Sequence, residues 1–176
     1  MCIRDRNEAE DRDLDPIERE IYRIDLKDLK RTALTNRDGP DSNPLVSPNG
    51  KLIAYTGYDD KVLSYQQTQL YVMNADGSDR QLLSKDFDRS IGRLAWNGNR
   101  EIIAQVDNAG ETDLVNFNLN GSASTRVSGL GGTAFGRPYS GSSFSLSSDG
   151  TVAYTCLLYT SPSPRDATLS RMPSSA

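Results

Sequence analysis

The stretch Leu45-Val-Ser-Pro-Asn-Gly-Lys-Leu-Ile-Ala-Tyr-Thr-Gly57 has the pattern of a strand, a tight turn and a second strand. Asn49-Gly50 is a dipeptide that tolerates the positive φ angles of a two-residue β-hairpin turn, and the residues on both sides favour strands. The pattern recurs as LAWNGNREIIAQVD from Leu94 and FSLSSDGTVAYT from Phe144. A hairpin is therefore the unit from which this chain is built.

A second unit alternates with the first. Three similar strand-like stretches begin at Ile21 (IYRIDL), Leu70 (LYVMNA) and Leu114 (LVNFNL), about 49 and about 44 residues apart, a spacing typical of propeller blades. Each is followed by a short strand-like stretch, and the last two reach it through Asp76-Gly77 and Asn120-Gly121. The first stretch also fits a helix opening at Pro16, but the two later copies favour a strand from Ile21 to Leu26.

Four short antiparallel strands per repeat predict an all-β fold of β-propeller blades. Along the chain we count the outer half of one blade, two complete blades and the inner half of a fourth, which predicts a partial, open β-propeller. A blade buries its faces only against its neighbours, so exposed blade faces and unpaired strand edges predict association of the isolated chain.

The two ends of the chain resemble translated sequencing-library DNA and not part of the protein between them. Met1–Arg6 and Cys156–Ser161 can be written with codons that are reverse complements of each other, and they resemble the mosaic end of a sequencing-library transposon. The residues from Pro162 onward resemble the adapter and flow-cell primer that follow such an end. We therefore divide the chain into adapter-derived residues 1–6, a partial propeller at residues 7–155, and an adapter-derived, disordered segment at residues 156–176.

Composition excludes several classes of function. The chain has a formal net charge of −4, with 20 Lys and Arg against 24 Asp and Glu, which disfavours nucleic acid or an anionic membrane as a partner. It contains no histidine, and its two cysteines, Cys2 and Cys156, lie in the adapter-derived ends. We therefore expect no metal site of Cys and His ligands. The cysteines do not identify a compartment; we favour a periplasmic or secreted location over the cytoplasm, with the true N-terminus missing.

The propeller repeats resemble a known family. SPNGKLIAYTG followed by LYVMNADGSDRQLL resembles the TolB-type, WD-like propeller repeat, whose turn is usually Ser-Pro-Asp-Gly. TNRDGPDSNP, DFDRSIGRLAW and GRPYSGSSFSLSSDGTVAYT are similar to the N-terminal propeller of bacterial prolyl-oligopeptidase-type serine peptidases of the acylaminoacyl-peptidase-like branch. Asn49 replaces the usual Asp, and the turn at Asn97-Gly98 lacks Ser-Pro; both sequences still favour a turn.

This resemblance implies a non-catalytic domain that gates peptide access to a C-terminal α/β-hydrolase domain absent from the chain. The implied partners are that domain and a peptide substrate. The residues agree that catalysis is not carried here, because a Ser-His-Asp triad needs an imidazole and no G-x-S-x-G motif is present. The alternative is a TolB-like scaffold that binds protein partners and has no enzymatic activity.

Candidate binding residues are few. Arg89, Arg137 and Tyr139 lie in loops that enter the inner strand of a blade, where they are placed to touch a peptide or the missing domain. The alternative for Arg89 is a simple surface pair with Asp88. We assign no catalytic residue, no cofactor and no metal.

Two motif-like stretches are rejected as binding sites. GLGGTA from Gly129 matches a dinucleotide fingerprint, but Gly136 and Pro138 follow at once and prevent the helix that such a site needs, so we interpret it as an inter-blade loop. DRDLD from Asp11 spaces carboxylates as a calcium loop does. Pro16 and Tyr22 stand where that loop needs Gly and Glu, so we interpret it as a solvated acidic segment.

Overall fold

The computed structural model describes residues 2–8, 13–131 and 142–156, and within these ranges the regular structure is entirely β. Thirteen strands form four antiparallel sheets in this part of the chain. The bounds are β1 Cys2–Arg6, β2 Glu20–Ile24, β3 Arg31–Ala33, β4 Asp41–Val46, β5 Leu52–Gly57, β6 Gln69–Asn74, β7 Gln81–Leu82, β8 Ile91–Asn97, β9 Glu101–Asn108, β10 Glu111–Asn118, β11 Ala123–Leu130, β12 Phe144–Leu146 and β13 Val152–Tyr154.

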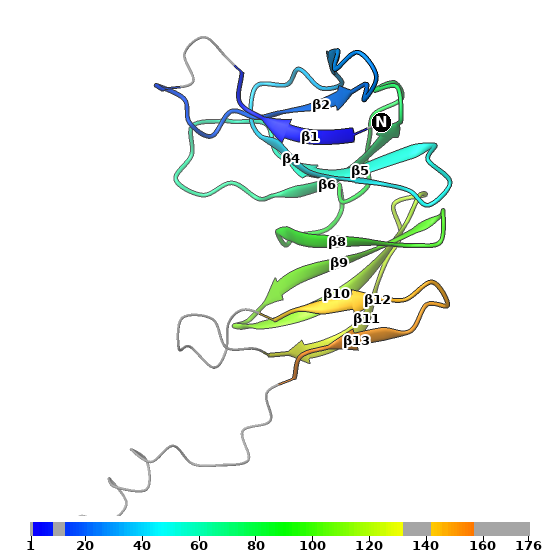
Figure 1. Ribbon diagram of the computed structural model, residues 1–176. Coiled ribbons are helices and arrows are strands. Elements are labelled where there is room, and N and C mark those ends of the chain that lie inside the picture. Colours follow the sequence, from blue (N-terminus) through cyan, green and yellow to red (C-terminus); the bar gives the residue numbers. More distant parts are fainter. Residues whose placement is uncertain (1, 9–12, 132–141, 157–176) are drawn as a thin grey trace, which may run out of the picture.

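The sheets follow one another along the chain as the repeats predict. Two of them are complete blades, with strand orders β4-β5-β6-β7 and β8-β9-β10-β11. A two-stranded sheet, β12-β13, follows them, and β2-β3 precede them within a three-stranded sheet. Figure 1 shows the sheets stacked one after another in an arc that does not close. The chain is therefore a partial, open β-propeller, as its sequence predicts.

The N-terminal residues differ from the expectation. We set residues 1–6 outside the fold, yet Cys2–Arg6 form β1 and pair with β2 over five positions, from Cys2 opposite Ile24 to Arg6 opposite Glu20. No strand was predicted here, and the division of the chain at residue 6 stays a prediction. The pairing provides partners for backbone donors and acceptors of β2 that would otherwise form a free edge. In a complete blade the second strand holds this position, as β5 does beside β6. Residues 157–176 lie outside the described part of the chain.

The predicted hairpin turns are confirmed by their backbone angles. Gly50, Gly98 and Gly150 have φ of 72°, 66° and 85°, values that favour glycine because a Cβ atom is strained there. In the first of these turns the Ser47 hydroxyl donates to Asn49 Oδ1 at 2.8 Å and accepts from the amide of Leu52 at 2.9 Å. The serine of the repeat motif thus closes the turn.

The segment with a possible helical pattern is a strand, as the later repeats predict. β2 runs from Glu20 to Ile24, and Ile21 is fully buried. The amide of Ile21 donates to Thr35 Oγ1 at 2.8 Å, and the amide of Leu70 donates to Ser84 Oγ at 2.9 Å. Ile21 and Leu70 are therefore equivalent positions of two consecutive blades.

The hydrophobic core lies between the sheets as three clusters. The largest joins the two complete blades and includes Trp96, Phe117 and Leu70. A second cluster packs the first sheet against β5 and β6, and a third packs β9, β10 and β11 against β12. Trp96 also donates from Nε1 to the carbonyl oxygen of Leu45 at 2.9 Å, which ties the two complete blades together. In the described residues, no helix is long and apolar enough to span a membrane.

We expect Trp96→Phe to lower the free energy of unfolding by about 1–2 kcal/mol, because it leaves the Leu45 carbonyl without its donor and reduces the buried contact area. Urea unfolding followed by circular dichroism measures the change. Tyr65→Phe is the control, since Tyr65 is 73% exposed and should be close to neutral. Equal stability of the Trp96→Phe variant and the parent would show that this bond does not hold the blades together.

Candidate functional site

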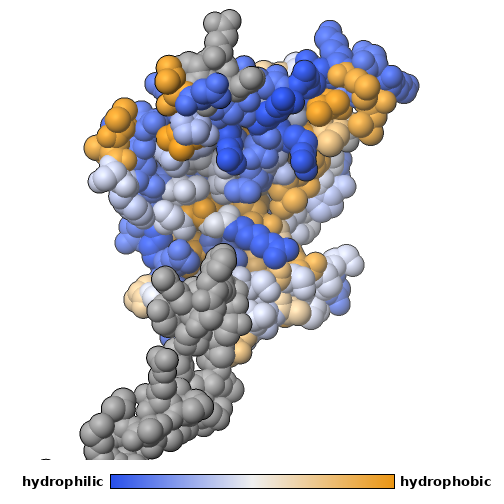
Figure 2. All heavy atoms as spheres, turned by 60° about the vertical axis from the view of Figure 1, so that its left-hand side comes forward, coloured by the Kyte–Doolittle hydropathy of each residue, from blue (hydrophilic) through white to orange (hydrophobic). Residues whose placement is uncertain are grey.

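Two surfaces of the arc are candidates for function: the rim formed by its longer loops and the wall formed by its innermost strands. The rim consists of residues 34–40, 58–68 and 83–90, which connect β3 to β4, β5 to β6 and β7 to β8. These loops lie on the left of Figure 1, opposite the hairpin turns. Figure 2 turns this side forward and shows a largely hydrophilic face with hydrophobic residues in separate groups.

Arg89 lies on this rim in an ionic cluster. Of the three predicted binding residues, it is the one within the described part of the chain. Its Nη1 is 3.3 Å from Oδ2 of Asp113, a buried residue at the start of β10, and its Nε is 3.6 Å from Oδ1 of the exposed Asp88. Asn108 also donates to Asp113 Oδ2 at 2.8 Å. The main partner of Arg89 is thus Asp113, which the sequence did not indicate. Arg137 and Tyr139 lie outside the described residues.

The Arg89 loop is fixed in place from the neighbouring blade. Gln67 Nε2 donates to the carbonyl oxygens of Phe87 and Arg89 at 2.7 Å and 2.9 Å. The Arg89 guanidinium lies over the Phe87 ring, 4.8 Å from its centroid. Arg89 is only partly exposed, so it is a positioned cation at the rim. Its role in binding stays a prediction.

A second ionic cluster, around Arg37, was not found from the sequence. Arg37 pairs with Asp41, the fully buried first residue of β4, and Arg37 Nη1 is 3.4 Å from Oδ1 of Asp59. Its guanidinium lies 4.3 Å from the ring centroid of Tyr71. The pair Arg37 and Asp41 is four residues apart, in a segment that the sequence marks only as a loop with Gly and Pro. The pair is notable because both side chains are largely buried, and the burial of a side chain cannot be recognised from a loop sequence.

Burial raises the pKa of two carboxyl groups in this region, that of Asp41 in the cluster and that of Glu20, the first residue of β2. Burial raises the pKa of Glu20 from 4.5 to about 7, against a hydrogen bond from Thr35 that lowers it. Burial also raises the pKa of Asp41 from 3.8 to about 6, although the charge of Arg37 opposes this. One oxygen of each carboxyl group has no hydrogen-bond partner, which explains why the charged forms are disfavoured.

Gly57 makes room for the buried pair. A Cβ atom at this position would touch the Arg37 guanidinium and the Asp41 carboxylate and would lie 2.5 Å from the carbonyl oxygen of Pro40. The φ angle of Gly57 is not in the left-handed region, so space and not backbone conformation requires the glycine here.

The tip of the loop at residues 58–68 presents apolar side chains to solvent. Val62 is 91% exposed, and Leu63 and Tyr65 are also exposed. Val62 has a φ of 53°, a strained angle for a β-branched residue. This loop also borders a surface hollow of about 330 Å³ that Tyr58, Gln66 and Gln67 help to line.

The wall is formed by β4, β8 and β12, the first strands of the two complete blades and of the two-stranded sheet that follows them. β4 lies beside β8, and β8 lies beside β12. In a propeller, the strands that converge in this way surround the central channel. A hollow of about 350 Å³ on this wall is lined by residues of all three strands, including Leu45, Arg93 and Ser145. The Arg93 guanidinium lies over the Phe144 ring, 5.6 Å from its centroid.

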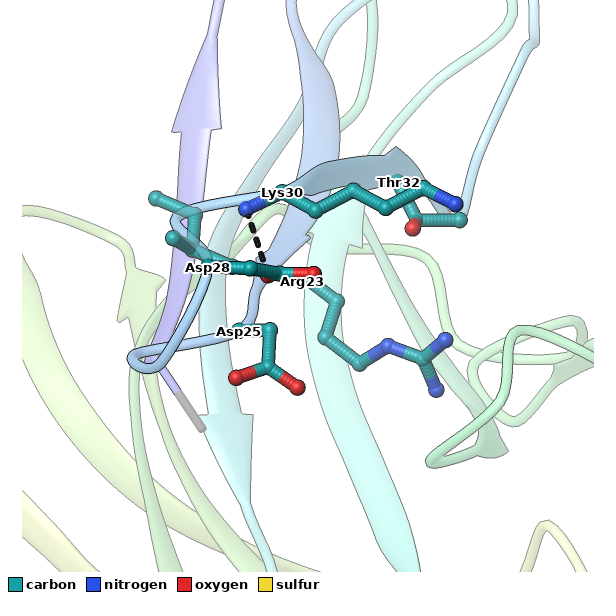
Figure 3. A pocket seen from close by; sticks show the side chains of 6 residues that line it. Arg23, Asp25, Asp28, Lys30 and Thr32 are labelled. Atoms are coloured by element: carbon teal, nitrogen blue, oxygen red, sulfur yellow. Dashed lines mark hydrogen bonds between the residues drawn. The ribbon is translucent and has the colours of Figure 1, made fainter.

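A hollow of about 350 Å³ also lies beside the turn between β2 and β3 (Figure 3). Its charged groups are Arg23, Asp25, Asp28 and Lys30. The two carboxylates accept from backbone amides of their own turn, Asp25 from Lys27 at 2.8 Å and Asp28 from Lys30 at 2.9 Å. They stabilise the turn, so this hollow is a weaker candidate than the rim or the wall.

The rejected motifs lie partly outside the described residues. Of GLGGTA, residues 129–131 are described, and Gly129 has a φ of 71°. Of DRDLD, residues 13–15 are described. Among the described residues, no group of three His, Cys, Asp or Glu side chains is placed to hold a metal ion.

An arc of four-stranded antiparallel blades defines the β-propeller class, and solved structures agree. The chain is similar to TolB from Acinetobacter baumannii, with a TM-score of 0.54 and 19% identity over 82% of this chain and 33% of that chain. It is also similar to a puromycin-hydrolyzing peptidase of Mycobacterium tuberculosis, with a TM-score of 0.56 and 16% identity over 78% of this chain and 22% of that chain.

The chain thus has a TolB-like β-propeller fold and spans a third or less of these two structures. No protein-family model matches the sequence, and comparison with curated proteins gives no match.

We expect Gly57→Ala to lower the free energy of unfolding by roughly 3 kcal/mol, because the added methyl group displaces one partner of a buried ion pair. Urea unfolding measures the change. Gly98→Asn is the control, since nothing lies within 4 Å of a Cβ atom at Gly98 and Asn tolerates its φ of 66°. A Gly57→Ala variant as stable as Gly98→Asn would show that the pair moves aside without cost.

The raised pKa of Glu20 predicts a pH dependence of stability. A carboxyl group that binds its proton more tightly in the folded state stabilises the fold at low pH, and this contribution is lost as the pH rises through about 7. The free energy of unfolding should therefore rise as the pH falls from about 8 to about 5. Glu20→Gln should reduce this rise and match the parent best at the acidic end, and the remaining rise should come from Asp41, whose pKa is also raised. If Glu20→Gln keeps the full increase in the free energy of unfolding, the pH dependence does not come from Glu20.

Proposed function

We propose that this chain is a wall segment of a β-propeller that gates peptide access to an α/β-hydrolase domain of a serine peptidase. The observation that carries the proposal is the wall itself: β4, β8 and β12 lie side by side and form a continuous surface with a hollow and a cationic side chain, Arg93. A ring of such walls makes a channel that admits an extended peptide and excludes a folded protein. Likeness to a peptidase structure supports this reading.

In this proposal the reactive groups belong to another part of a longer protein. The chain has no histidine, so it supplies no general base of the Ser-His-Asp type. The wall contributes selection by size and by charge, and Arg93 suits a peptide with a carboxylate near the channel surface.

The rim suits contact with the hydrolase domain. Val62, Leu63 and Tyr65 place apolar side chains on an exposed loop, and such side chains gain stability when a partner covers them. Arg89 lies on the same rim and is held in place by Asp113 and Gln67. We assign the rim to the domain contact and the wall to the peptide.

The second candidate is a scaffold that binds protein partners without any catalytic domain. The likeness to TolB favours it, since that structure has the same fold with a similar TM-score. The two candidates share the fold and differ in what accompanies the propeller in the longer protein.

The test is to recover the longer reading frame that contains the codons for residues 7–155 and to express its product. The peptidase proposal expects an α/β-hydrolase domain with a G-x-S-x-G motif followed by Asp and His, and hydrolysis of chromogenic peptides but not of a folded protein. The present chain should hydrolyse neither. A frame that closes the propeller and ends without such a domain would overturn the peptidase proposal and favour the scaffold.

A further inference from the structure

The two ends of the arc are complementary halves of one blade. β12 and β13 occupy the first and second strand positions, and β2 and β3 occupy the third and fourth. In both complete blades the second strand pairs with the third, β5 with β6 and β9 with β10. Among the described residues, no strand pairs with the outer edge of β13. Joining β13 to a β2 strand would therefore produce a complete four-stranded blade.

Backbone hydrogen bonds define which residues of β13 and β5 are equivalent. The amide of Ser47 donates to the carbonyl of Leu52, and the amide of Ser147 donates to the carbonyl of Thr151, so Thr151 takes the place of Leu52. Residues 152–155, Val-Ala-Tyr-Thr, then correspond to residues 53–56, Ile-Ala-Tyr-Thr. β13 thus has nearly the same sequence as a strand that is already paired on both sides.

The same comparison gives the register against β2. Ile21 is equivalent to Leu70, as their hydrogen bonds to Thr35 and Ser84 show. In the complete blade Tyr55 lies opposite Tyr71 and Thr56 opposite Leu70. The corresponding pairs are Tyr154 with Tyr22 and Thr155 with Ile21.

The tyrosine pair makes this register chemically specific. Tyr55 and Tyr71 are stacked, with ring centroids 5.3 Å apart and an interplanar angle of 16°. Tyr154 is 45% exposed, and Tyr22 is only partly buried. Pairing β13 with β2 would stack these two rings in the same way and bury both.

We propose that a second copy of this chain docks here, β13 of each copy pairing with β2 of the other. β2 and β13 lie at opposite ends of the arc in Figure 1, so one chain cannot join its own halves. Each copy supplies two complete blades and two half-blades, so two copies related by a two-fold axis form a closed ring of six blades. Propellers of about four to eight blades are stable rings, and closure of the ring would leave only the short inner and outer strand edges that every blade has.

β1 competes for the same edge. It pairs with β2 and places Arg4 opposite Tyr22, where the second copy would place Tyr154. Ile3 is its only contribution to the adjoining hydrophobic cluster. Assembly therefore requires β1 to leave β2, and a weaker β1 should favour it. This inference does not rest on the proposed function, since it concerns only strand pairing in this chain.

The first experiment measures mass against concentration by light scattering for the full chain and for Ile3→Pro. Proline removes a backbone donor and disfavours the strand, so Ile3→Pro should lower the dissociation constant of the dimer by about tenfold or more. Ile3→Val is the matched control and should behave as the parent. If Ile3→Pro needs the same or a higher concentration to dimerise than Ile3→Val, the proposal is overturned.

The second experiment tests the register in full chains whose native cysteines are replaced by Cys2→Ser and Cys156→Ser. Tyr22→Cys with Tyr154→Cys should give a disulfide-linked dimer on oxidation with glutathione disulfide. Arg23→Cys with Tyr154→Cys places the two thiols on opposite faces and should not. Equal cross-linking of both variants, or of neither, would overturn the proposed pairing, as would larger open polymers in the scattering experiment.

Discussion

The structure depends on the burial of sheet faces between neighbouring blades. Each four-stranded sheet has apolar side chains on both faces, and neither face is covered by a helix within the described residues. Ile53, Tyr55 and Met73 of the second sheet face the first sheet, whereas Ala54, Leu70 and Val72 face the third. Strand alternation alone produces this division. Each blade is therefore stable only as part of a series.

This constraint explains what the sequence could predict. The hairpins are local, because Asn-Gly and Asp-Gly with flanking strand-forming residues specify a turn and its two strands without any distant partner. Repetition then resolves the ambiguous segment around Ile21, since Leu70 and Leu114 mark the same strand in later blades. Counting the repeats was enough to predict an open arc.

The features that the sequence did not predict depend on tertiary contacts. The ion pair of Arg37 and Asp41 and the partnership of Arg89 with Asp113 join loops to strands of the adjacent blade or sheet, and no spacing rule connects them. β1 was missed for another reason. Its residues carry no strand pattern of the repeat, and the free edge of β2 selects them because of its unpaired backbone groups.

The same free edge has a practical consequence for protein engineering. The half-blade pairs with Cys-Ile-Arg-Asp-Arg, a segment unrelated to its own repeat. Strand addition at this edge therefore depends mainly on backbone hydrogen bonds and only weakly on the side chains of the added strand. Short peptides appended to an incomplete propeller are then candidates for incorporation as strands, and an affinity tag placed there becomes part of a sheet and is masked from its antibody.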